Sequence, residues 1–140
     1  MATIVRKIIS TKAAAKPVAP YNQAILVDRT LYVSGCLGLD ACTMKLVAGG
    51  AAAEARQALT NLGHILAAGD SSYDRVVKTT VLLADLADFA AVNEVYGQVF
   101  THDHPARSSF QVGALPMNAK VEIEVVAVSG DVRTIPAVEC

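Results

Sequence analysis

The segment Pro105–Val112 places one fixed positive charge, Arg107, in a run that is otherwise typical of a buried strand. Side chains alternate along a strand, so Arg107 is predicted to share a face with Ser109 and Gln111. A guanidinium stays protonated at working pH and presents a planar fork of donors that matches a carboxylate. The run therefore predicts a site for a small organic anion. The structural alternative is an internal ion pair that neutralises the arginine.

A second candidate group lies near the carboxyl end, where Glu122 and Glu124 alternate with valine and isoleucine. The two carboxylates are predicted on one face of a strand and the apolar side chains on the other. Such alternation is also the ordinary pattern of an antiparallel strand with one solvated face, and that interpretation stays open. If Glu122 lies near a cleft, its carboxylate can pair with Arg107, or it can hold and polarise a water molecule.

The elements that must position these groups follow from hydrophobic periodicity and turn residues. The predicted order is a strand ending near Ser10, a hairpin, a helix, a strand, a helix and two final strands, over 4–10, 24–27, 30–34, 51–68, 74–84, 85–101, 106–115 and 120–129. This βββαβαββ order predicts a single α/β (α+β) domain over 1–140, with a mixed sheet and both helices on one face. The apolar face left open is predicted to pack against copies of the chain.

Composition narrows the class of protein. The 140 residues are 53% hydrophobic and 18% charged with a net charge of −1, so no overall basic field attracts nucleic acid. Charged residues interrupt every long apolar run, which argues against a membrane span and predicts a soluble protein. The start lacks a signal-peptide pattern, and Cys36, Cys42 and Cys140 lack metal-like spacing, so free thiols in the cytosol are expected. A minor nuclear or mitochondrial fraction is left open.

Five short segments carry a resemblance to a known family. They are Pro20–Ala24, Tyr32–Gly35, Val92–Tyr96, Pro105–Ser108, and Val121–Glu124 followed by Ala127. Together they make the chain, from Ile4 to about Gly130, similar to the reactive intermediate deaminase A family. This family is also called YjgF, and the chain looks closest to its eukaryotic members, formerly described as perchloric-acid-soluble translation inhibitors.

The resemblance implies a chorismate-mutase-like fold and a homotrimer with active sites in clefts between neighbouring subunits. The implied reaction is hydrolysis of 2-iminopropanoate and 2-iminobutanoate to 2-oxo acids and ammonia, with no cofactor and no metal. The residues carried over as catalytic are Arg107 for the substrate carboxylate, Glu122 for the hydrolytic water, and Tyr21 at the cleft. The implied substrate contacts are Arg107, Ser34, Gly35, Ser109 and Asn93.

The chain departs from the family pattern at several of these positions. Ala19 replaces a glycine that usually precedes Pro-Tyr, Asn22 replaces a frequent serine, and Cys36 follows Gly35 where glutamine is common. Ser109 stands where many relatives carry cysteine, which excludes a thiol nucleophile there. Backbone contacts would survive this change, because any residue supplies an amide and a carbonyl.

Two other classes of function compete with imine hydrolysis. An endoribonuclease that inhibits translation would favour histidines titrating near neutrality and aromatic platforms in a basic groove. Only His64, His102 and His104 are available, the first on a predicted helix and the others in a predicted loop, so RNA is a disfavoured partner. A non-catalytic binder of small carboxylates, or a chaperone-like protein, would need Arg107 and not Glu122. Cys36 is a further candidate for redox sensitivity.

Overall fold

The computed structural model describes residues 1–139 and confirms the predicted order of strands and helices. The elements are β1 (Arg6–Ile9), β2 (Ala24–Val27), β3 (Thr30–Cys36), α1 (Gly50–Ala68), β4 (Val76–Leu83), α2 (Phe89–Val99), β5 (Ala106–Gln111) and β6 (Val121–Val128). Three short 3₁₀ turns accompany them, at Tyr73–Arg75, Leu86–Asp88 and Pro116–Asn118. The strand predicted over 106–115 is shorter than expected, because the chain leaves the sheet after Gln111.

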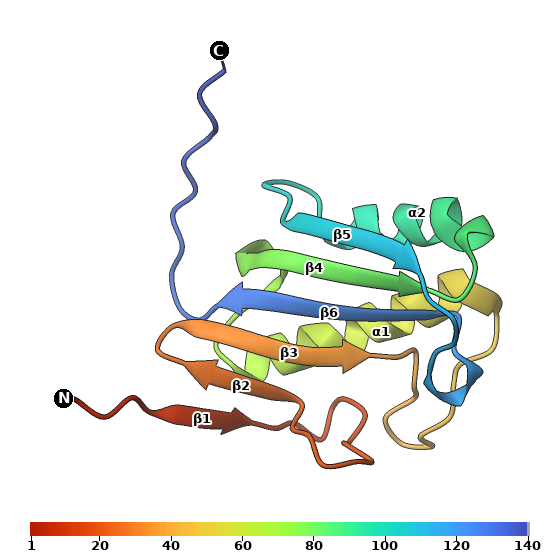
Figure 1. The fold of residues 1–140 in the computed structure, drawn as a ribbon, viewed down its shortest axis with the longest axis horizontal. Helices are drawn as coiled ribbons and strands as arrows, with labels where there is room; N and C mark the ends of the chain where they lie inside the picture. Colours follow the sequence, from red (N-terminus) through yellow and green to blue (C-terminus); the bar gives the residue numbers. More distant parts are fainter. Residues whose placement is uncertain (140) are drawn as a thin grey trace.

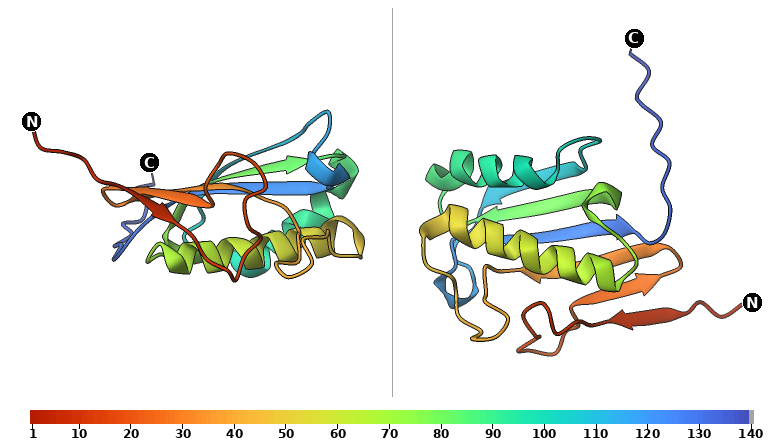
Figure 2. Two further views of the ribbon diagram at one scale, coloured as in Figure 1. Left: turned by 90° about the horizontal axis from the view of Figure 1, so that it is seen from below. Right: turned by 180° about the vertical axis from the view of Figure 1, so that it is seen from behind.

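One six-stranded sheet forms the framework, in the order β1-β2-β3-β6-β4-β5. Only β4 and β5 are parallel, since α2 connects them as a crossover helix, and the other neighbours are antiparallel. Both helices lie on the same side of the sheet (Figures 1 and 2), which confirms the predicted two-layer arrangement. This strand order places β5, which carries Arg107, at one edge of the sheet.

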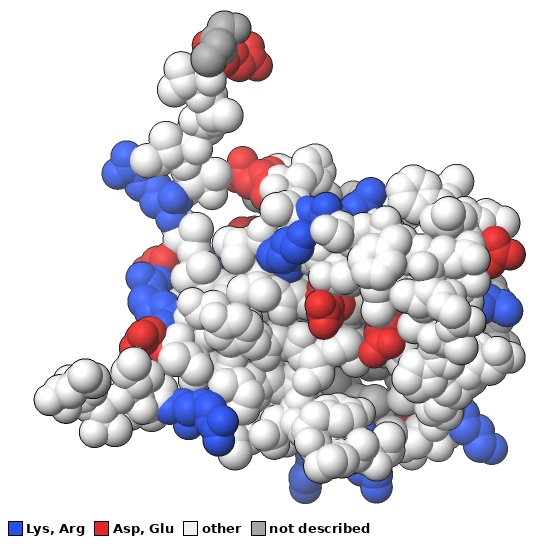
Figure 3. All heavy atoms as spheres, in the orientation of Figure 1, with Lys and Arg blue, Asp and Glu red and all other residues white. Residues whose placement is uncertain are grey.

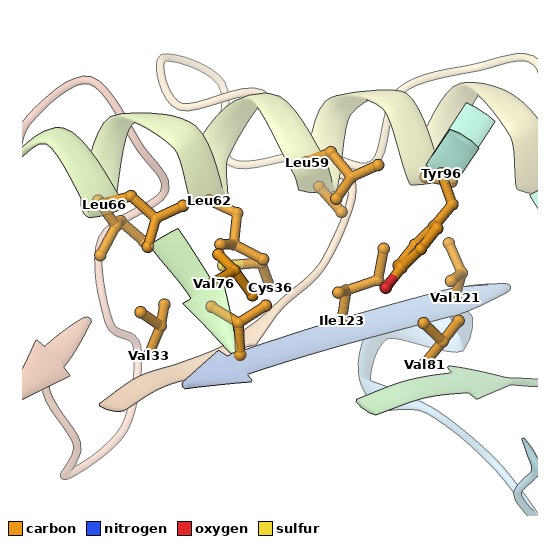
Figure 4. Packing of buried hydrophobic residues seen from close by; sticks show 14 of the residues in the cluster. Val33, Cys36, Leu59, Leu62, Leu66, Val76, Val81, Tyr96, Val121 and Ile123 are labelled. Atoms are coloured by element: carbon orange, nitrogen blue, oxygen red, sulfur yellow. The ribbon is translucent and has the colours of Figure 1, made fainter. Parts of the chain in front are cut away.

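The hydrophobic core lies between the sheet and α1. The helix presents an apolar stripe, and its buried members face Val33, Val76 and Ile123 of the sheet (Figure 4); they include Ala55, Ala58, Leu59, Leu62, Ile65 and Leu66. The apolar residues of the second helical segment are only partly buried. Val92 and Tyr96 are buried, but Leu86 and Phe89 are 52% and 38% exposed. They lie at the start of the second helical segment.

The opposite face of the sheet has no helix over it. Exposed apolar side chains on this face include Ile8, Tyr32 and Phe110, which are each half exposed or more. Figure 3 views the molecule from this side and shows a largely uncharged surface around a small group of charged side chains near its centre. The chain thus has the uncovered apolar face that was predicted from its composition. Within residues 1–139, no helix combines the length and the apolarity that a bilayer crossing requires.

Candidate active site

A cavity of about 430 Å³ opens beside the ends of β3 and β6. The loop between β1 and β2 and the turn before β6 form its rim, and the loop after β3 lines its inner wall. The residues that line it are Ala14, Ala15, Lys16, Val18, Tyr21, Gln23, Ser34, Gly35, Cys36, Leu37, Leu39, Asn61, Ile65, Pro116, Met117, Glu122 and Glu124. Four of the seven predicted site residues are among them: Tyr21, Ser34, Gly35 and Glu122. We call these four the acid half of the site.

Glu122 is half-buried on the uncovered face of β6, with its carboxylate directly over Gly35. A Cβ atom at position 35 would overlap the Glu122 carboxylate oxygen, so the absence of a side chain at Gly35 makes room for this acid. Burial raises the pKa of Glu122, and the neighbouring Glu124 carboxylate raises it further. An acid of this kind can take and return a proton closer to neutrality than an ordinary glutamate.

The two polar side chains beside Glu122 come from the β2–β3 hairpin and the loop before it. The Ser34 hydroxyl donates to the Asn22 carbonyl at 2.6 Å, and the Ser34 amide donates to the Gln23 carbonyl at 3.0 Å. The Tyr21 side chain is 48% exposed and borders the cavity. Ser34 therefore ties the loop that carries Tyr21 to the strand that carries Gly35.

Two buried amides hold the cavity walls, and the sequence analysis missed both. The Gln23 side chain accepts from the Thr11 amide at 2.7 Å and donates to the Ala15 carbonyl at 2.9 Å, which fixes the loop after β1. Asn61 donates to the Leu37 and Leu39 carbonyls at 3.3 and 2.8 Å. An amide between Leu59 and Leu62, on the apolar stripe of α1, was the available signal for Asn61, since buried polar groups need partners.

Cys36 lies behind Gly35 and is buried. Burial raises the pKa of its thiol to about 12, and the negative charge of Glu122 contributes to the rise. The thiolate is the reactive form of cysteine, so this environment disfavours oxidation of Cys36.

Arg107 lies away from the acid half. The strand that was predicted to be buried is the edge strand β5, and Arg107 is exposed. Its Nη1 donates to the Asn93 Oδ1 of α2 at 2.7 Å, so the partner of its charge is a neutral amide rather than an acid. Arg107 pairs in register with Thr79, on the helix-covered face, whereas Glu122 pairs with Leu82, on the other face. The predicted option that Glu122 pairs with Arg107 within the chain is therefore wrong.

Ser109 lies two residues after Arg107 and on the same face of β5. Its hydroxyl oxygen is buried and has no hydrogen-bond partner among the residues that the structure describes. A buried hydroxyl without a partner is unusual in a folded protein and indicates that another group meets it. We call Asn93, Arg107 and Ser109 the arginine half of the site.

The histidines and acids offer no alternative centre in the part of the chain that is described. His64, His102 and His104 are exposed, and none of them lines the cavity. Over residues 1–139, no three side chains among His, Cys, Asp and Glu come together as metal ligands would. The ionisable and hydroxyl groups that line the cavity are the Glu122 and Glu124 carboxylates, the Tyr21 phenol, the Ser34 hydroxyl and the Lys16 ammonium.

Comparison with known proteins agrees with this geometry. Residues 11–129 match the family described as endoribonuclease L-PSP. This chain belongs to that family. The family includes the reactive intermediate deaminases to which the sequence was predicted to be related, and the prediction is confirmed.

Individual members of the family match almost the whole chain. The RutC family protein UK114 of Drosophila melanogaster is 64% identical over 96% of this chain and 97% of its own length. The 2-iminobutanoate/2-iminopropanoate deaminase of Bos taurus is 54% identical over 96% and 98%. The crystal structure of E. coli TdcF with bound serine is 36% identical, covers 89% of this chain and 99% of its own, and has a TM-score of 0.84.

Proposed function

We propose that this chain is a hydrolytic deaminase that converts reactive 2-imino acids, with 2-iminopropanoate and 2-iminobutanoate as substrates, to 2-oxo acids and ammonia. The observation that carries the proposal is the half-buried Glu122 over Gly35, in a cavity that also contains Tyr21 and Ser34. The bovine relative, which is named for this activity, supports the assignment.

The reaction needs a positioned water and a proton carrier rather than a covalent nucleophile. An imine carbon beside a carboxylate is electrophilic once its nitrogen is protonated. Glu122 accepts a proton from water as the oxygen attacks this carbon, which gives a tetrahedral carbinolamine. The proton then passes from Glu122 to the nitrogen. Glu122 takes the hydroxyl proton as the carbon–nitrogen bond breaks, so that ammonia leaves and the carbonyl forms. Tyr21 orients the water, and no cofactor takes part in these steps.

The arginine half binds the substrate carboxylate. Arg107 gives one N–H to Asn93 and keeps further donors for a ligand, and the unpaired Ser109 hydroxyl lies on the same face. Serine, the molecule bound in the TdcF structure, also carries a carboxylate on a short carbon chain, which supports a ligand of this size. Ser34 and Gly35 complete the substrate contacts from the acid half.

The two halves act together if neighbouring copies assemble. Within one chain, Arg107 is not among the residues that line the Glu122 cavity, and the two side chains lie on opposite faces of the sheet. A homotrimer with sites between subunits brings the arginine half of one copy to the acid half of the next. The uncovered apolar face, with Tyr32 and Phe110, supplies a surface for this assembly.

RNA is the less favoured substrate, although the family description includes endoribonuclease. The cavity is lined by two glutamates and one lysine, and its residues include no histidine. The negative charge of Glu122 and Glu124 would repel a phosphate backbone. We place the enzyme in the cytosol, where pyridoxal-phosphate enzymes release the enamines that become its substrates, and cell fractionation tests this placement.

A coupled assay tests the proposal. A pyridoxal-phosphate dehydratase generates the imine, and formation of 2-oxo acid is followed with and without the purified chain. We expect acceleration by the wild type and a loss of about 10²- to 10⁴-fold in Glu122→Gln, the usual contribution of a general base. Glu94→Gln, an exchange of the same type on α2, is the control. Equal rates with wild type, Glu122→Gln and no protein would refute the assignment.

A further inference from the structure

The Arg107 side chain extends from an exposed edge strand, yet its guanidinium must be held in a defined orientation to match a carboxylate. Arginine has a long side chain with several free torsions, and ordering it on binding costs entropy. An arginine that is already held in place avoids this cost when the ligand arrives.

Helix α2 supplies a cradle for the guanidinium. The Arg107 Cζ lies 4.8 Å from the ring centroid of Tyr96 and 5.8 Å from that of Phe89. Its Nη1 donates to Asn93 Oδ1 at 2.7 Å. Tyr96 and Phe89 thus lie at cation–π distance from the guanidinium, and Asn93 accepts a hydrogen bond from it.

Tyr96 is itself fixed by a hydrogen bond inside the core. Its hydroxyl lies 2.8 Å from the Thr79 Oγ1, and both residues are buried, with Thr79 fully inaccessible. Figure 4 shows the Tyr96 ring extending from α2 toward the sheet, with its oxygen at the far end near Ile123 and Val81. Phe100 packs against the same ring with a centroid separation of 4.5 Å. The orientation of the ring is therefore set from the core side.

The register of the sheet connects this core bond to the arginine. Thr79 of β4 is the in-register partner of Arg107 of β5, and both point to the helix-covered face. The Tyr96 ring therefore reaches past Arg107 to the residue beside it. Without this hydrogen bond, burying the Thr79 hydroxyl would cost free energy that a valine of nearly the same volume would not.

We propose that Tyr96, held by Thr79, is a positioning residue that orients Arg107 for the substrate carboxylate. The proposal rests on the proposed function in that Arg107 binds this carboxylate. Because the carboxylate is present in the substrate and throughout the reaction, a misplaced Arg107 weakens ground state and transition state alike. The effect appears in KM rather than in kcat.

Three variants test the role. Tyr96→Leu removes the ring, Tyr96→Phe keeps the ring and loses the hydroxyl, and Thr79→Val removes the partner of that hydroxyl at constant volume. We expect KM to rise about three- to thirtyfold in Tyr96→Leu, the range of a cation–π contact, with kcat nearly unchanged. Tyr96→Phe and Thr79→Val keep the ring but lose the hydrogen bond that fixes it, so each should raise KM by less than Tyr96→Leu does. Val92→Ala, a buried truncation on the same helix, is the control for general destabilisation and leaves KM unchanged.

A second measurement needs no turnover. The Nε–H resonance of Arg107 is expected to be shifted by the ring current of Tyr96 and to move toward the free-arginine position in Tyr96→Leu. If imine hydrolysis fails in the wild type but this shift is lost on substitution, the proposed function is wrong and the orientation of Arg107 by Tyr96 stands. A KM in Tyr96→Leu equal to that in Val92→Ala, or an unmoved resonance, overturns the positioning role.

Discussion

A site divided between copies predicts that two inactive chains restore each other. Arg107→Ala removes the carboxylate anchor, and Glu122→Gln removes the proton carrier on the opposite face of the sheet. Each variant alone contains only damaged sites. When the two are mixed in one trimer, some interfaces combine the intact Glu122 of one chain with the intact Arg107 of another.

The size of the recovery follows from the geometry. Two charge-assisted hydrogen bonds to Arg107 at about 1.5–3 kcal/mol each contribute about 3–6 kcal/mol, so Arg107→Ala should lower kcat/KM by about 10²- to 10⁴-fold. Glu122→Gln should lower it by a similar factor. In every trimer that contains both variants, one interface of the three is intact on both sides, so the mixed trimers should recover about a third of the wild-type activity.

The assay is co-expression of the two variants with different tags, followed by tandem purification and the coupled imine assay. Co-expression of wild type with Arg107→Ala sets the scale, and a double variant that carries both changes on one chain is the control. Mixed trimers as inactive as either parent would refute the division of the site between copies. The reasoning would also fail if the isolated monomer had full activity.

Four further predictions concern three positions, Glu122, Gly35 and Asn61. Glu122→Gln should unfold at an equal or higher temperature than the wild type at neutral pH, and this difference should vanish as pH falls toward the ordinary glutamate value of 4.5. The sign follows because a raised pKa in the folded state means that ionisation of Glu122 destabilises the fold, and calorimetry across pH checks it. For the same reason the acid limb of the wild-type kcat/KM profile should lie above pH 4.5. Gly35→Ala should displace the Glu122 carboxylate and lower kcat/KM by about 10²-fold, whereas Gly97→Ala, with open space around the added carbon, should leave the rate unchanged. Asn61→Leu should lower the free energy of unfolding by about 1–3 kcal/mol, because the Leu37 and Leu39 carbonyls lose their donor. Denaturant titration measures this loss, and Thr60→Ala, at an exposed position of the same helix, is the control. Equal free energies of unfolding for the two variants would contradict the prediction.

Local pattern was enough to predict the strands and the faces of their side chains. The alternation around Glu122 placed both acids on one face, and the helix predicted over 51–68 agrees with α1, since periodicity is a local property. The position of β5 at the sheet edge was not predictable in this way. It depends on β6 inserting between β3 and β4, a pairing of segments far apart in the chain. The exposure of Arg107 and of Phe89 follows from this placement.

The site itself was only partly accessible from sequence. The resemblance supplied Tyr21, Ser34, Gly35 and Glu122, and the structure brings these four together. The structural role of the Gln23 side chain was not predicted, because a glutamine in a polar loop gives no periodic signal. The contact of the Tyr96 ring with Arg107 was not predicted, because it joins α2 to β5 and no local pattern contains it.

If copies share the site as proposed, the separation of Arg107 and Glu122 onto opposite sides of one sheet would make specific activity depend on chain concentration. Diluted below its subunit dissociation constant, each chain would keep all of its functional side chains, yet turnover would stop. Product formation would then fall more steeply than the amount of protein, and a fragment or peptide that occupies the Tyr32 and Phe110 surface would act as an inhibitor without approaching the substrate cavity.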